Sequence, residues 1–259
     1  MPLKVLFLIP AIFIVAAPLF SQVKRPEPLP RKPDFEYSRQ IIVVTTSGWN
    51  LIQGTARLFE RETRASGWKA SSEPFPVVVG RSGLGWDKAE LDDQLAPALD
   101  RTYIKREGDG RAPAGLFPLT FTFGNEDVGS RLPFTKLDEF TECVDDTNSS
   151  FYNKIVNRMH VGNFDWKSSE KMLAVGEQYD LGIFVAYNSY PAIRGNGSCI
   201  FLHIWKDDHT GTAGCTAMSR NDLERIVKWL DPAKTPYLVQ MTETEYNSLR
   251  QRLRLPKLN

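Results

Sequence analysis

The chain has 259 residues, with 32 Lys and Arg against 31 Asp and Glu and a formal net charge of +1. This balance gives neither the broad basic field that holds nucleic acid nor an acidic tail, so composition argues against a polyanionic partner. The length allows one large domain or two small ones.

The N-terminus predicts export. Lys4 is followed by an unbroken apolar run over residues 5–20 and then by Ser21, which is the order of a secretory signal peptide. The run is short for a membrane span. We therefore expect residues 1–21 to direct the protein to the periplasm or cell envelope; the alternative is an uncleaved N-terminal anchor.

Residues 22–39 predict a linker. Four prolines alternate here with charged residues, a composition that cannot bury a core and favours an extended, semi-rigid tether. We expect the folded domain over residues 40–241, followed by a helical extension over residues 242–259.

Short β-branched or alternating segments, separated by Gly and Pro turns, predict a β-rich, sandwich-like domain. The expected strands are Gln40–Thr46, Thr55–Glu62, Pro76–Gly80, Phe117–Phe123, Leu181–Tyr187, Cys199–Trp205 and Tyr237–Met241.

Two capping boxes predict helices. Ser219 with Asp222 precedes apolar residues at helical spacing, and Asp231-Pro232 ends that run. Thr242 with Glu245 begins a second helix, which we expect to cover one edge of the sheet; the alternative is a loosely attached tail. The fold class is thus β-rich mixed α/β, with a few short helices.

Three cysteines and three histidines carry the candidate chemistry. An odd number of cysteines in an exported chain suggests one pair and one free thiol. Cys215 is the odd one by context, because it ends a run of small residues that begins at Gly211. Small neighbours let a substrate backbone approach, and loop amides can receive a developing oxyanion.

His203 lies near the end of an expected strand, upstream of Cys215. A strand, a loop and a return to the same sheet edge can bring the two side chains together, so that the imidazole activates the thiol. The alternative is a hydrogen-bonded structural histidine, and spacing alone does not decide between them.

Two blocks of the sequence carry a resemblance to a known family. The segment Gly197–Trp205, followed by Thr212-Ala213-Gly214-Cys215, resembles the catalytic stretch of the L,D-transpeptidase (YkuD-type) family, where a strand His precedes a Ser/Thr-x-Gly-Cys element. Upstream, Lys105–Phe117 resembles a second family block, a glycine-rich turn with Pro-x-Gly-x-Phe. The resemblance spans about residues 40–241.

The resemblance implies a YkuD-like sandwich and a cysteine acyltransferase that acts on peptidoglycan stem peptides. Cys215 matches the nucleophile, His203 the base, and the Gly214 and Cys215 amides part of the oxyanion site. The Ile204 carbonyl matches the group that orients the histidine. Thr212, in the same element, is expected to contact substrate. We expect a monomer without cofactor or metal.

The sequence departs from the best-known family pattern at three points. Ala213 stands where many members have His, Ala217 replaces a frequent Arg or Asn, and the loop between His203 and Cys215 is shorter than in many members. These differences indicate a divergent branch. L,D-carboxypeptidase or amidase activity on the same substrate and a non-catalytic cell-wall-binding module therefore stay open; the retained Cys–His pair favours an enzyme.

Further residues are candidates for the cleft. Arg111 is a candidate anchor for a stem-peptide carboxylate, Asn188 is expected to reach the site from a neighbouring loop, and Trp205 and Trp86 are expected as cleft walls. Their alternatives are a surface arginine, a turn-capping asparagine and core tryptophans.

His209 raises the possibility of a metal site. With His203 and Cys215 it offers zinc-ligating side chains, but the spacing fits no compact ligand motif and a solvated loop is preferred. His160 has no partner in the sequence and is interpreted as structural or surface.

The remaining cysteines, Cys143 and Cys199, are expected to form a disulfide, because export places the chain where disulfides persist and Cys215 is assigned to catalysis. A bridge there would brace the strand that carries His203. The alternative is two buried free thiols that behave as small hydrophobic residues.

Overall fold

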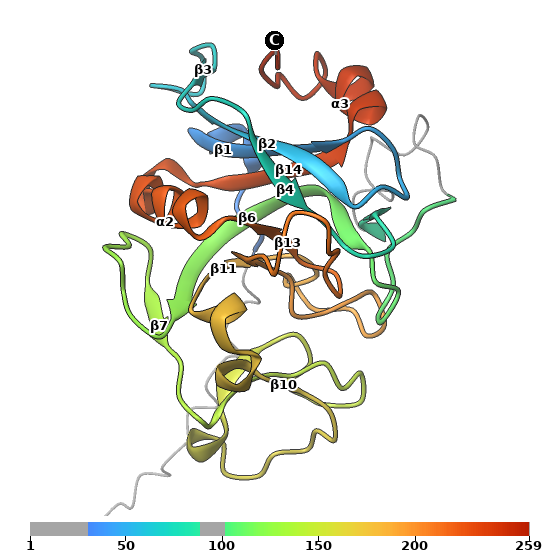
Figure 1. Ribbon diagram of the computed structural model, residues 1–259, viewed down its shortest axis with the longest axis vertical. Helices are drawn as coiled ribbons and strands as arrows, with labels where there is room; N and C mark the ends of the chain where they lie inside the picture. The colour runs from blue at the N-terminus through green and yellow to red at the C-terminus, as the bar shows by residue number, and fades with distance from the viewer. Residues whose placement is uncertain (1–30, 89–101, 259) are drawn as a thin grey trace, which may run out of the picture.

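The computed structural model describes residues 31–88 and 102–258 (Figure 1). The expected signal peptide, residues 1–21, and residues 22–30 of the expected linker lie outside this part of the chain. Within it, each helix is too short or too polar to cross a membrane.

Strands dominate the fold, and the helices are short. The strands are β1 (Gln40–Thr46), β2 (Gln53–Glu60), β3 (Lys69–Ala70), β4 (Phe75–Val78), β5 (Leu84–Trp86), β6 (Ala112–Gly124), β7 (Phe134–Lys136), β8 (Thr141–Cys143), β9 (Ile155–Asn157), β10 (Glu170–Lys171), β11 (Leu181–Val185), β12 (Phe201–Ile204), β13 (Thr216–Met218) and β14 (Tyr237–Thr242). The α-helices are α2 (Arg220–Trp229) and α3 (Glu243–Leu249), and the 3-10 helices are η1 (Phe35–Tyr37), η3 (Arg158–His160), η4 (Met172–Tyr179) and η5 (Pro232–Lys234).

The long strand β6 joins the two layers of a sandwich. Its residues 115–118 pair with β14, while residues 119–124 pair with β11. In Figure 1 it curves through the middle of the molecule. The strand order runs β1-β14-β6-β11-β12-β13-β4-β2, and β1 also pairs with β2, so hydrogen bonds connect the two layers on both sides. The expected β-rich sandwich is confirmed.

All seven expected strands are present. β1 has the expected bounds, whereas β6 begins at Ala112 rather than Phe117, because its first residues pair with β5. We refer to these layers, β1–β6 with β11–β14, as the sandwich.

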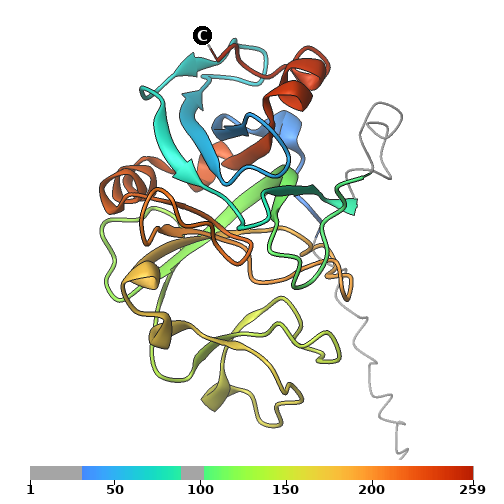
Figure 2. The same ribbon diagram turned by 45° about the vertical axis from the view of Figure 1, so that its right-hand side comes forward.

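The sequence did not predict the segment between β6 and β11. Residues 125–180, which we call the insert lobe, contain a small sheet of order β10-β8-β9 and the helices η3 and η4. Figure 2 shows this lobe below the sandwich. Its two ends meet where the Asn125 side-chain amide donates to the Asp180 carboxylate at 2.6 Å.

Two buried clusters explain why β11 and β12 are apolar throughout. Ile183, Leu202 and Ile204 pack into the core between the layers. Phe184 and Phe201 point the other way, into a second cluster under the insert lobe. Because side chains alternate along a strand, coverage of both faces requires a continuous apolar run.

The predicted helices form at the predicted caps. The Ser219 hydroxyl accepts from the Asp222 amide, and α2 buries Leu223, Ile226 and Val227. Thr242 caps α3 in the same way. The expectation that the last helix covers a sheet edge was wrong: α3 packs on β1 and β14, which both have partners on either side.

The expected linker is docked over its last residues. The ring of Phe35 packs edge-on against Tyr237, with ring centroids 5.2 Å apart, and the Arg61 guanidinium donates to the Ser38 and Glu36 carbonyls. An extended tether up to residue 39 was therefore a wrong prediction for this end, because its aromatic residue finds a partner on β14.

Candidate active site

The parallel strands β12 and β13 bring Cys215 and His203 to one face of the sandwich. His203 is in register with Ala217, and Leu202 with Thr216, so Cys215 lies just before β13 and beside Phe201. Residues two apart on a strand point the same way. The Cys215 thiol and the His203 imidazole therefore both face the insert lobe.

A short loop with a fixed shape delivers Cys215 to this position. The Thr212 hydroxyl donates to the Cys215 carbonyl at 2.6 Å and accepts from the Gly214 amide at 3.1 Å. Gly211 passes so close to Arg81 that an added Cβ would lie 2.6 Å from its Cα. Thr212 thus shapes the loop, and the Gly214 amide, expected in the oxyanion site, is already engaged by that hydroxyl.

The thiol of Cys215 is buried and neutral. Its residue is 5% exposed; the Phe201 amide donates to the sulfur at 3.3 Å, and the thiol faces the Cys199 carbonyl at 3.5 Å. Burial, with the nearby Glu170 carboxylate, raises the thiol pKa to about 12. The hydrogen bond from the Phe201 amide, the charge of Lys105 and the nearby Tyr179 side chain act the other way and lower the thiol pKa.

His203 is also buried and neutral. Burial lowers the pKa of its imidazole to about 4, and the hydrogen bond to the Ile204 carbonyl only partly opposes this. Nδ1 lies 2.8 Å from that carbonyl oxygen. A carbonyl only accepts, so Nδ1 carries the proton and Nε2 is left as the basic nitrogen. This is the orientation that the resemblance implied.

A cavity of about 170 Å³ lies beside the thiol. Cys199, Ile200 and Gly214, which surround Cys215, form part of its wall. The wall also contains five charged residues: Arg81, Lys105, Glu107, Asp145 and Glu170. This cavity offers a polar substrate a space next to the residues that surround the sulfur.

Hydrogen bonds and ion pairs hold several of these charged residues in place. The Lys105 ammonium donates to Asp109 at 2.8 Å, inside the glycine-rich turn of the second family block. Glu107 accepts from Ser198 at 2.8 Å and from the Tyr152 hydroxyl. One oxygen of Asp145 is buried without a hydrogen-bond partner.

The insert lobe is fastened to the strand of His203. Cys143 on β8 and Cys199 form a disulfide, and Cys215 remains a free thiol. The Asn153 side chain adds a second attachment: it accepts from the Cys199 amide at 3.0 Å and donates to the Tyr187 and Asn188 carbonyls. The lobe thus forms one wall of the active-site cavity.

Two of the expected substrate-contacting residues hold other parts of the fold. The Arg111 guanidinium donates to the carbonyls of Trp49 and Leu84 and to Asn50, which connects the loop between β1 and β2 to the start of β5. Asn188 closes its own loop by hydrogen bonds to Ile193 and Gly197. Neither lines the cavity beside Cys215, because their polar atoms are already satisfied.

Of the two tryptophans expected in the cleft wall, Trp86 lies in the core at 1% exposure, packed on Trp49. Trp205 is half-buried and its backbone amide donates to Met218. Neither lines the cavity beside Cys215.

The other histidines lie outside the cavity. His209 is exposed and pairs with Asp208, and His160 lies in η3 of the insert lobe. Over residues 31–88 and 102–258, no three His, Cys, Asp or Glu side chains gather in a metal-binding group.

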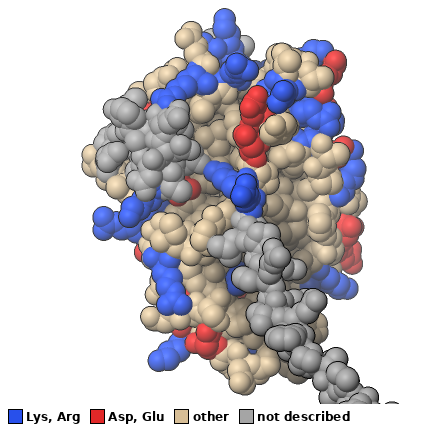
Figure 3. Space-filling view, turned by 180° about the vertical axis from the view of Figure 1, so that it is seen from behind, with Lys and Arg blue, Asp and Glu red and all other residues tan. Residues whose placement is uncertain are grey.

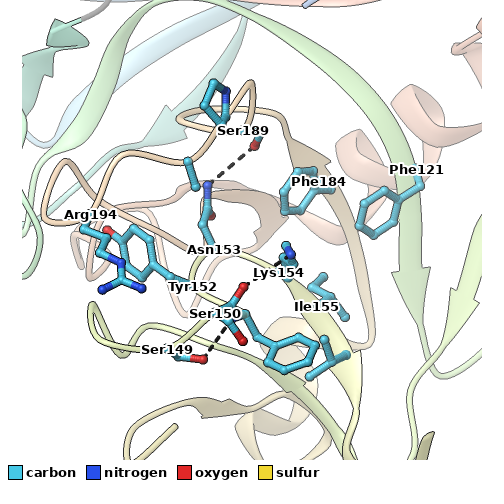
Figure 4. Close-up of a pocket in the computed structure, with 14 residues that line it drawn as sticks. Phe121, Ser149, Ser150, Tyr152, Asn153, Lys154, Ile155, Phe184, Ser189 and Arg194 are labelled. Carbon is cyan, nitrogen blue, oxygen red and sulfur yellow. Dashed lines mark hydrogen bonds between the residues drawn. The ribbon is translucent and has the colours of Figure 1, made fainter. Parts of the chain in front are cut away.

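A larger cavity lies at the lobe. It measures about 710 Å³ and is lined by aromatic residues, with Arg194 and Lys154 among the polar ones. Figure 4 shows Phe121 and Phe184 side by side in its wall and a hydrogen bond between Asn153 and Ser189. Ala213 and Gly214, which directly precede Cys215, line the smaller cavity and not this one, so the smaller cavity is the one next to the candidate nucleophile.

Charges are scattered over the back of the molecule. On the face drawn in Figure 3, Lys and Arg side chains lie apart from one another on a largely uncharged surface. The described part of that face offers no broad field of one sign, in keeping with the balanced composition.

The sequence did not single out Tyr179, Glu170, Glu107 and Asp145. Three come from the insert lobe, where no periodic pattern marks an element. The sequence offered only a weak indication of their position. Glu170 lies just before the helix η4 and Tyr179 at its end, and the expected strand β11 begins two residues later.

The comparisons with known proteins give one match. A family model of the L,D-transpeptidase catalytic domain, YkuD, matches residues 53–239, which include Cys215, His203 and the whole insert lobe. No curated protein and no solved structure matches the chain.

Proposed function

The chain belongs to the L,D-transpeptidase catalytic domain family, whose members act as cysteine enzymes on peptidoglycan peptides, and we propose that it is an exported transpeptidase with Cys215 as nucleophile. The observation that carries this proposal is the common face of Cys215 and His203 on β12 and β13, with Nδ1 of His203 held by the Ile204 carbonyl.

In the acylation step, the Cys215 thiol gives its proton to Nε2 of His203 while the sulfur attacks the carbonyl carbon that precedes a D-residue. The tetrahedral oxyanion needs a donor, and the Cys215 amide is the candidate, since the Gly214 amide is engaged by Thr212. Collapse breaks the C–N bond, the leaving amine takes the proton from His203, and a thioester remains.

In the second step, an acceptor amine attacks the thioester and gives its proton to His203. Collapse then expels the Cys215 sulfur, which regains the proton, and a new peptide bond is formed. Water in place of the amine gives a shortened stem instead, which is the carboxypeptidase outcome.

The neutral ground state favours proton transfer during attack over a stored thiolate–imidazolium pair. Burial opposes both charges, raising the pKa of Cys215 and lowering that of His203. The substrate therefore has to enter before the charges develop.

Arg81, which is exposed and lines the cavity, replaces Arg111 as the candidate partner for a stem-peptide carboxylate.

The test is incubation with defined tetrapeptide muropeptides, followed by mass analysis of the products. Cross-linked dimers support the transpeptidase, shortened stems the carboxypeptidase, and released wall-linked groups the amidase. Failure to form any product, together with failure to form a covalent adduct with a carbapenem, would support the binding module.

Cys215→Ala is expected to lower product formation by more than about 10³-fold with the fold retained, because the sulfur is the reacting atom. His203→Ala should lose about 10²- to 10⁴-fold, as for a general base. Circular dichroism and the denaturation midpoint serve as controls. Substantial turnover by the Cys215 variant would rule out the assignment.

Export is a separate part of the proposal. N-terminal sequencing of protein recovered from the cell envelope should begin near Gln22 if residues 1–21 are removed. An intact N-terminus on membrane-bound protein would support the uncleaved anchor instead.

A further inference from the structure

The insert lobe places a tyrosine against both members of the Cys–His pair. The ring of Tyr179, at the end of η4, lies 5.3 Å from the His203 ring at an interplanar angle of 64°. It also packs edge-on against Phe123 and Phe201, with centroids 5.6 and 5.5 Å away. Ring contacts with three residues fix where the Tyr179 hydroxyl points.

The hydroxyl donates to Glu170 on β10 at 2.8 Å. Tyr179 and Cys215 belong to the same buried cluster, and the Tyr179 side chain is one of the groups that lower the thiol pKa. Glu170 lines the cavity together with the neighbours of Cys215.

We propose that the Tyr179 hydroxyl is a hydrogen-bond donor to the Cys215 sulfur as this sulfur becomes negatively charged, and that Glu170 is the positioning residue that controls it. The inference rests on the proposed role of Cys215 as nucleophile. It assigns a part of the catalytic site to the insert lobe, beyond the Cys–His pair that the strands supply.

Glu170 can control the tyrosine because the Tyr179 hydroxyl has a single proton to donate. While Glu170 is ionised, the Tyr179 hydroxyl donates to its carboxylate. When Glu170 is protonated, its own O–H can donate to the Tyr179 oxygen, and the tyrosine proton is then free to turn towards the sulfur. Loss of the Glu170 charge also removes a repulsion that opposes the thiolate.

The surroundings of Glu170 favour this protonated state near neutral pH. Burial is the main cause that raises its pKa to about 7; the Tyr179 hydrogen bond opposes it, and the charges of Asp145 and Glu107 add to the rise. Lys105 and Arg81 are the cations that line the same cavity, and Lys105 lowers the thiol pKa.

The experiment measures the alkylation rate of Cys215 by iodoacetamide from pH 5 to 10, by intact mass, on the full chain. Cys143 and Cys199 are joined, so Cys215 is the reactive thiol. Tyr179→Phe keeps the ring on His203 and removes the hydroxyl. It should lower the rate about tenfold at pH 6, where Glu170 is protonated and the hydroxyl is free to donate to the sulfur, since one hydrogen bond to a charged group is lost.

Glu170→Gln should act in the opposite direction and raise the rate at pH 8, because the repelling charge is gone. Matched controls are Tyr246→Phe, whose buried hydroxyl donates to the Pro256 carbonyl in the C-terminal segment, and Glu60→Gln on β2. Both controls should leave the profile unchanged.

Opposite shifts of the two variants support the inference, and a purely structural role would move both the same way. An unchanged rate for Tyr179→Phe, or a lower rate for Glu170→Gln, would overturn it; if Tyr179→Phe does not fold, Glu170→Gln decides alone. Alkylation needs no peptidoglycan, so an inactive protein that still shows opposite shifts disproves the proposed substrate and leaves this inference standing.

Discussion

The sandwich and the insert lobe form opposite walls of one cavity but are held by different interactions. In the sandwich, strand pairing and a continuous core place Cys215 and His203. The lobe has short strands of two or three residues, of which β7 pairs with β6. Beyond that pairing, it is attached by the Cys143–Cys199 disulfide, the Asn153 hydrogen bonds and the hydrogen bond from Tyr152 to Glu107. Regular pairing thus positions Cys215 and His203, whereas single cross-links hold the part of the lobe that faces them.

The largest expected effect on stability comes from the disulfide. In the double variant Cys143→Ala/Cys199→Ala, a loop that spans 56 residues is no longer closed in the unfolded chain, which costs about 4 kcal/mol in the chain-entropy model. Urea denaturation measures this loss. Limited proteolysis should then cut within residues 125–180 before the sandwich. Simultaneous cleavage of the lobe and the sandwich would show that the lobe does not unfold separately from the sandwich.

Two carboxylates, one in the lobe and one in the sandwich, should contribute to stability with opposite dependence on pH. Burial raises the pKa of Glu170 from 4.5 to about 7, so the folded lobe keeps a proton that the unfolded chain releases. Its contribution to stability is present below pH 4.5 and is lost as pH rises to 7, by roughly 3 kcal/mol at most. Relative to the wild type, Glu170→Gln should gain stability by this amount between pH 4.5 and 8.

Glu60 on β2 is the matched case in the sandwich. Burial would raise its pKa, but hydrogen bonds from Lys234 and Gln40 outweigh burial and lower it. Its stabilisation is present above pH 4.5 and is lost as pH falls, so Glu60→Gln should cost a constant amount from pH 6 to 8. Urea denaturation of both variants at several pH values measures the change in the free energy of unfolding. If this change varied with pH in the same way for both variants, the opposite pKa shifts of Glu170 and Glu60 would be contradicted.

The same contrast explains which parts of the molecule the sequence could predict. β1 and β14 are short, mainly apolar runs, and α2 has apolar residues at helical spacing after a capping residue, so their positions follow from local rules. Cys215 and His203 were predicted because the segment that contains them resembles the catalytic stretch of the family, whereas their spacing alone did not decide. Tyr179 and Glu170 were missed because their positions depend on a long-range disulfide and on irregular backbone, which leave no periodic signal. The contacts of Arg111 could not be predicted because the carbonyls that it binds come from residues remote in sequence.

A pair of glycines tests whether the loop of Cys215 is as rigid as the contacts indicate. Gly211→Ala puts a Cβ 2.6 Å from the Cα of Arg81, a backbone atom that cannot turn aside. We expect a loss of about 2 kcal/mol and reduced Cys215 reactivity, because the loop has to shift. Gly162→Ala in the lobe meets no atom within 4 Å and should stay within about 0.5 kcal/mol. Denaturation midpoints and iodoacetamide rates decide; equal effects at the two positions would refute the loop's rigidity.

The smallest expected effect concerns the helix cap that follows β13. The Ser219 hydroxyl accepts from the Asp222 amide at 3.2 Å and donates to the Asp222 carboxylate at 2.6 Å. Ser219→Ala leaves one first-turn amide of α2 without its partner, which costs about 1 kcal/mol. Ser248→Ala on the exposed side of α3 is the control and should change stability little, since alanine favours helix interiors. Cys215 lies four residues before this cap on the same strand and loop, so alkylation rates distinguish two cases. An unchanged rate with the stability loss means that strand pairing alone holds the nucleophile, as the comparison of the two regions requires; a slower rate would show that α2 also positions it.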